Sequence, residues 1–110
     1  MEYAMLINHG LCFGCDSCKV SCMKEKNLPF EEPGITIQQI GPMKLDGKWE
    51  WDYVPVPTSL CDLCADRRAQ GKKAACEQHC LSLVIEVLPV DQIGARMVEL
   101  GGKKVSVFMP

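Results

Sequence analysis

The chain has 110 residues and a formal net charge of −2, and 47% of its residues are apolar. A chain of this length forms one small domain, so we expect a single domain over residues 1–110. Its slight acidity, without a basic stripe, argues against nucleic acid as a partner, and no run approaches the ~18 apolar residues of a membrane span.

The first half of the chain alternates short apolar runs with turn residues. Residues 3–8 read as a strand. Residues 18–26 read as a short helix that Asn27 ends. Residues 35–40 are β-branched and partly alternating, which predicts a strand, and residues 48–56 alternate more regularly. The last two segments therefore predict a β-hairpin with a long connection.

The second strand of this hairpin carries aromatic residues on one face. Trp49, Trp51 and Tyr53 alternate with acidic residues, and Pro55 and Pro57 are expected to stop the strand. An amphipathic hairpin needs something to cover its aromatic face. That cover is either the rest of this domain or a partner subunit.

The apolar run over residues 82–88 predicts another strand, which Pro89 should end. Asp91 is the predicted N-cap of a helix that continues to Leu100. The apolar face of this helix should be formed by Ile93, Met97 and Leu100.

The C-terminal helix should end at Gly101 and Gly102, and residues 103–109 read as a last strand. Together with Pro89 these elements form a C-terminal extension over residues 89–110. A second addition, residues 28–60, carries the hairpin and separates two cysteine-rich segments. The sequence thus predicts a compact cysteine core with one inserted segment and one C-terminal extension.

All eight cysteines fall in two blocks. The first block reads C-x2-C-x2-C-x3-C and the second reads C-x2-C-x11-C-x3-C. Their members are Cys12, Cys15, Cys18 and Cys22, and Cys61, Cys64, Cys76 and Cys80. A tight loop with three cysteines at this spacing can wrap three corners of a cubane, and Gly14 helps that wrapping. The two blocks therefore predict metal ligands for two [4Fe-4S] clusters, with four thiolates for each.

Three alternatives remain open at this point. Zinc binds four-cysteine sites, but four thiolates within eleven residues overcrowd one small tetrahedral ion. A disulfide scaffold is compatible with an even number of cysteines, although no signal peptide precedes Cys12. One site could instead hold a [3Fe-4S] centre or another cluster type, although each block has all four cysteines.

The first cysteine spacing resembles the run of bacterial ferredoxins, in which the fourth cysteine serves the other cluster. The resemblance implies that cluster 1 is held by Cys12, Cys15, Cys18 and Cys80. It implies that cluster 2 is held by Cys61, Cys64, Cys76 and Cys22. The implied fold is α+β, with a ferredoxin-like two-cluster core, an inserted β-hairpin and a C-terminal helix–strand extension.

A larger part of the chain, roughly residues 3–88, resembles a particular family. Residues 12–29 (CFGCDSCKVSCMKEKNLP) and 61–80 (CDLCADRRAQGKKAACEQHC) resemble two motifs of the iron-sulfur subunits that serve molybdenum- or tungsten-pterin oxidoreductases of the dimethyl sulfoxide reductase family. Those subunits usually carry four clusters, whereas this chain has cysteines for two. Two prolines of the family's second motif are also replaced, by Ala74 and Leu81.

The resemblance implies a non-catalytic subunit that passes single electrons to or from a molybdenum- or tungsten-pterin catalytic subunit. A further electron donor or acceptor could be a second partner. The main alternative is a free, soluble two-cluster ferredoxin that serves several partners, and a third is a zinc-stabilised interaction module. The expected location is cytoplasmic. Export in folded form, with a partner that carries the signal, is the alternative.

The gap within the second cysteine block is basic. It contains Arg67, Arg68, Lys72 and Lys73. Positive charge beside a cluster stabilises its reduced form and raises its potential. The same residues could dock an acidic partner or simply form a solvated face.

Overall fold

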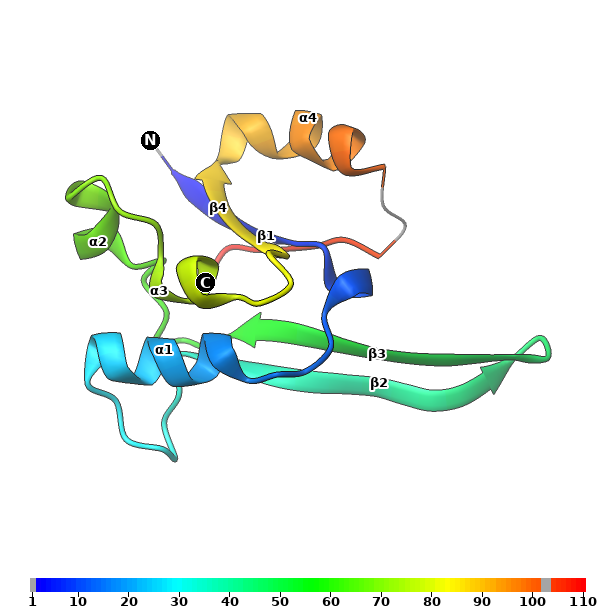
Figure 1. Cartoon of the computed structure of the whole chain (residues 1–110). Helices are drawn as coiled ribbons and strands as arrows, with labels where there is room; N and C mark the ends of the chain where they lie inside the picture. The colour runs from blue at the N-terminus through cyan, green and yellow to red at the C-terminus, as the bar shows by residue number, and fades with distance from the viewer. Residues whose placement is uncertain (1, 102–103) are drawn as a thin grey trace.

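The structure is a computed structural model that describes residues 2–101 and 104–110. It combines short helices with two antiparallel sheets (Figure 1). Its elements in chain order are β1 (Tyr3–Ile7), η1 (His9–Leu11), α1 (Ser17–Lys26), β2 (Ile35–Leu45), β3 (Lys48–Pro57), α2 (Ala65–Ala69), α3 (Ala75–His79), β4 (Ile85–Pro89), α4 (Val90–Leu100) and β5 (Ser106–Phe108).

The three-stranded sheet has the order β4-β1-β5, with β1 in the centre and antiparallel to both neighbours. Leu6 of β1 lies opposite Glu86 on one side and Val107 on the other. The strand predicted at residues 3–8 is therefore confirmed. It is the element that joins the N-terminal segment to the C-terminal extension.

Both faces of this sheet are covered, because β1 is almost wholly buried from Ala4 onward. Ala4 and Leu6 pack with Ile93 of α4 on one face. Met5 and Ile7 point to the other face, where they join a larger core that contains five of the eight cysteines. The alternation of side chains along a strand thus separates an ordinary apolar layer from the layer that holds the thiols.

The two-stranded hairpin of β2 and β3 projects from this core as a long arm (Figure 1). Asp46 and Gly47 form its two-residue turn, and both have positive φ values, as a twisted hairpin turn requires. Lys104 ties the arm to the body of the protein. Its ammonium lies 2.6 Å from the Asp52 carboxylate and 3.3 Å from that of Glu50.

The structure corrects the predicted end of β3. Pro55 does not stop the strand, because it is buried and pairs in register with Ile37, and β3 ends only at Pro57. A proline is tolerated there because the hairpin has only two strands, so each strand has a free edge that needs no N–H donor.

The predicted C-terminal helix is confirmed, but its start and its apolar face differ from expectation. α4 follows β4 directly, with Pro89 as the N-cap residue and Asp91 inside the first turn, where its charge favours the helix dipole. Ile93 is buried, whereas Met97 is exposed. Gly101 ends the helix in a left-handed conformation.

Two further predictions for the C-terminus fall partly on residues 102 and 103. Gly102 and Lys103 lie outside the described residues, and the last strand, β5, spans only three residues. Within the described chain, no helix has the length and apolar character needed to cross a membrane.

Candidate metal centres

The first cysteine block wraps around the start of α1. Cys12 and Cys15 lie in the loop between η1 and α1, and Cys18 and Cys22 lie one turn apart on the helix, where both are buried. Gly14 has a φ of 74°, and a Cβ at this position would lie 3.0 Å from the Tyr53 ring. The loop therefore needs glycine both for its conformation and for its close approach to the hairpin.

The second cysteine block contains two short helices that the sequence did not predict, α2 and α3. Cys61 and Cys64 precede α2, and Leu63 and Cys64 both have positive φ values, which turn the chain tightly. Cys76 lies in α3, and Cys80 follows it as the C-cap residue. Each helix has only five residues, too few for an apolar periodicity to be read from the sequence.

Four cysteines from the two blocks line one small apolar cavity. They are Cys22 from α1 and Cys61, Cys64 and Cys76 from the second block. Met5, Ile35 and Leu63 complete much of the remaining wall. These sulfurs are the set that the ferredoxin resemblance implies for cluster 2, and cysteine is the donor that iron-sulfur clusters use. The residues present therefore fit such a group.

The other four cysteines gather at the opposite end of α1. The Cys80 thiol lies near enough to Cys12 and Cys18 to raise the pKa of both, and Cys15 lies near the same two thiols. Cys18 is also close to Cys76, so the two groups of sulfurs adjoin. Ligation by either group stays a prediction, but the structure brings each implied set together.

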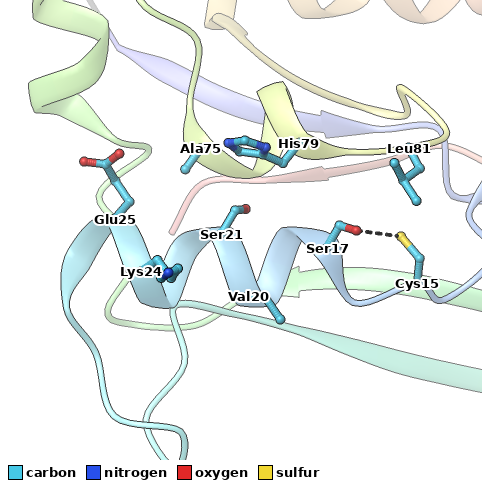
Figure 2. Close-up of a pocket in the computed structure, with 9 residues that line it drawn as sticks. All are labelled: Cys15, Ser17, Val20, Ser21, Lys24, Glu25, Ala75, His79 and Leu81. Carbon is cyan, nitrogen blue, oxygen red and sulfur yellow. Dashed lines mark hydrogen bonds between the residues drawn. The ribbon is translucent and has the colours of Figure 1, made fainter.

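Cys15 is the most accessible of the eight cysteines. It is exposed, and it lines an open groove between α1 and α3 together with His79 and Leu81 (Figure 2). The Ser17 hydroxyl lies 3.5 Å from its sulfur and lowers the pKa of the Cys15 thiol. The two groups thus differ in access, since the other set surrounds a cavity rather than a groove.

Most of the cysteine thiols are held in their neutral form by burial. Burial raises the pKa of Cys18 to about 12 and that of Cys22 to about 11, and it also raises the pKa of Cys12, Cys61 and Cys76. Since a metal binds thiolates, metal binding must displace these protons. A metal bound at these residues would therefore be held by thiolates in place of the buried neutral thiols.

The described cysteines do not form a single-ion site. All eight are free thiols, and no three Cys, His, Asp or Glu side chains in the described ranges converge closely enough to hold one metal ion. A zinc ion would draw four sulfurs to about 2.3 Å from one point.

Two of the four cations in the gap of the second cysteine block, which together we call the basic patch, are engaged within the fold. Arg67 pairs with Glu25, and Arg68 stacks over the Tyr3 ring at 4.1 Å while it donates a hydrogen bond to the Leu63 carbonyl. Only Lys72 and Lys73 remain as exposed cations of this segment without such contacts among those described.

Sequence reasoning missed a polar pair beside the cavity. The Lys26 ammonium lies 2.8 Å from the Asp62 carboxylate, and both residues line the cavity. Asp62 also accepts a hydrogen bond of 2.9 Å from the Cys64 N–H. Asp62 directly precedes the tight turn at Leu63 and Cys64, which is a local signal for the second contact, whereas the first contact joins positions 36 apart in the sequence.

Comparison with known proteins gives a partial relative. No family model matches the chain. The B component of polysulfide reductase from Wolinella succinogenes is 32% identical over 53 residues, which is 47% of this chain and 28% of that protein. The chain is thus similar, over about half of its own length and a little over a quarter of the relative's, to one component of a reductase.

Gly34 provides a test of the cavity. It lies between α1 and β2, and a Cβ there would come within 2.6 Å of the Cys22 sulfur. Gly34→Ala should therefore displace this sulfur, and we expect iron content to fall from about eight to about four per chain. Gly94→Ala is the matched control, because nothing lies within 4 Å of its added Cβ. Full iron content in Gly34→Ala would contradict the role of Cys22.

Proposed function

We infer that this chain is a non-catalytic electron-transfer subunit with a ferredoxin-like core that carries two [4Fe-4S] clusters. The observation that carries this proposal is the gathering of eight free thiols into two groups of four, each drawn from both cysteine blocks. Bound clusters of this type accept and release single electrons. Cysteines 12, 15, 18 and 80 would hold one cluster, and cysteines 22, 61, 64 and 76 the other.

The chain's own groups supply the surroundings that such clusters need. Backbone N–H groups point at three of the sulfurs: Leu63 at Cys61 at 3.4 Å, Ala75 at Cys64 at 3.4 Å, and Val84 at Cys80 at 3.5 Å. Hydrogen bonds to cluster sulfur and restricted solvent access both tune reduction potential. The apolar wall of the cavity excludes water on the side of cysteines 22, 61, 64 and 76.

The partial relative supports the role of a subunit. Its name describes one component of a polysulfide reductase, and the sequence motifs resemble iron-sulfur subunits of molybdenum- or tungsten-pterin enzymes. We therefore expect a catalytic subunit of that class as the partner. For the location we keep the expectation from the sequence, the cytoplasm, with export in folded form beside a partner as the alternative. The exposed aromatic side chains of the hairpin, Trp49 and Trp51, are the surface that such a partner would cover.

Metal analysis tests the cofactor assignment directly. Protein purified without oxygen should contain about eight iron atoms and about eight inorganic sulfides per chain, because each cubane has four of each. Its brown colour should bleach with dithionite. A reproducible content near four irons, or bound zinc in place of iron, would refute the two-cluster proposal.

The hairpin aromatics test the subunit assignment. Trp49 is 71% exposed and Trp51 57% exposed, so neither ring is needed by this chain's own core. Trp49→Ala and Trp51→Ala should leave the iron content intact but weaken assembly with the catalytic subunit by about 2–3 kcal/mol each. Val98→Ala, which removes a more exposed apolar side chain from α4, is the control for nonspecific loss.

The same experiment separates the subunit from the free ferredoxin. If native protein remains a stable monomer and reduces several unrelated enzymes equally well, the free-carrier alternative is correct. If both tryptophan variants lose iron, the two rings instead serve this chain's own fold.

A further inference from the structure

Arg67 joins three segments of the chain through one guanidinium group. Its Nη1 lies 2.7 Å from a Glu25 carboxylate oxygen, its Nε donates to the Lys73 carbonyl at 2.8 Å, and its Nη2 donates to the Gln78 side-chain oxygen. The Arg67 side chain is only 17% exposed. It is therefore not a freely solvated member of the basic patch.

The three partners lie beside cysteines of one group. Glu25 follows Cys22 by three residues on α1, so both lie on the same side of that helix. Lys73 and Gln78 lie on either side of Cys76, and Arg67 itself follows Cys64 by three residues. Arg67 thus connects the segments that carry Cys22, Cys64 and Cys76.

The arrangement at the other end of α1 is different. Cys15 lies in an open groove, and the ion pairs described between α1 and the second cysteine block, Lys26–Asp62 and Glu25–Arg67, both involve the last turn of the helix. The two ion pairs that connect the blocks therefore both lie beside the cavity of cysteines 22, 61, 64 and 76.

On the basis of the proposed function, we propose that Arg67 is a positioning residue for cluster 2. Its planar fork holds α1 and the segment around α3 at the separation that the four sulfurs of the cavity require. Lysine keeps the charge but cannot make three divergent hydrogen bonds from a planar group. The role thus depends on the geometry of the guanidinium as well as on its charge.

The experiment compares Arg67→Lys, Glu25→Gln and Lys72→Gln in the iron-loaded full chain. Lys72→Gln is the charge control, because Lys72 is exposed on the same basic segment. Iron release to a chelator is followed without oxygen. The reduced clusters are examined by electron paramagnetic resonance, with a redox titration that gives the midpoint potential of each.

In Arg67→Lys, we expect half of the iron to be released about tenfold faster, because charge-assisted hydrogen bonds to a carboxylate and an amide are lost, and the other half to be released at the wild-type rate. One cluster should show an altered resonance signal and a shifted midpoint potential. Glu25→Gln should show a smaller effect on the same half, and Lys72→Gln none.

Three outcomes would overturn the proposal: wild-type release in Arg67→Lys, equal acceleration of all the iron, or the same effect in Lys72→Gln. If Arg67→Lys does not accumulate as folded protein, Glu25→Gln carries the test, and monophasic wild-type release in that variant would overturn it. Wild-type protein without iron would instead refute the proposed function, so the two failures are distinguishable.

Discussion

The structure depends on where its sulfur atoms lie. Five of the eight cysteines are buried in the main core, among Met5, Ile7, Ile35 and Ile85. Burial raises the pKa of three of them, Cys18, Cys22 and Cys76, and so keeps these thiols protonated as weak hydrogen-bonding groups in the centre of the protein. A core of this kind is explained if iron replaces the protons, since the metal then contributes to folding as well as to function.

The chain brings these sulfurs together by folding its two cysteine blocks against each other. α1 carries the end of the first block past α3 of the second, and the central strand β1 closes the core from the other side. Ion pairs at the last turn of α1 then connect segments that are 36 and 42 residues apart in sequence. The hairpin projects from this core, but its first residue, Ile35, is buried in it, and Phe108 of the C-terminal extension packs against the same core.

The elements that the sequence predicted well are those with a strong local signal. β1, the hairpin and α4 have apolar or alternating patterns long enough to read, and Asn27 and Gly101 end α1 and α4 in left-handed conformations. α2 and α3 were missed because each is a single turn or slightly more. The prediction that Pro55 stops β3 was wrong. Whether a proline interrupts a strand depends on how many neighbouring strands need its N–H, and the local sequence does not show that number.

The candidate site was predictable only where it depends on a local signal in the sequence. Cysteine spacing identifies the donor set, and the resemblance to ferredoxins suggests which blocks exchange a ligand. The roles of Arg67, Lys26 and Gly34 arise from contacts between distant segments, so no window of the sequence could show them. The basic patch illustrates the difference: its four cations lie close together in sequence, but Arg67 and Arg68 are engaged within the fold.

The measurement that tests the two-cluster arrangement most directly is the electron paramagnetic resonance spectrum of Cys22→Ser and of Cys80→Ser. Each variant is loaded with iron and then reduced. Cys22→Ser should alter the cluster held by Cys61, Cys64 and Cys76, and Cys80→Ser the one held by Cys12, Cys15 and Cys18, with the unaltered cluster in each variant as an internal reference. To assign the signals, Cys61→Ser and Cys12→Ser mark each cluster. If Cys22→Ser matched Cys12→Ser instead of Cys61→Ser, each block would hold its own cluster, and the crossed arrangement would be wrong.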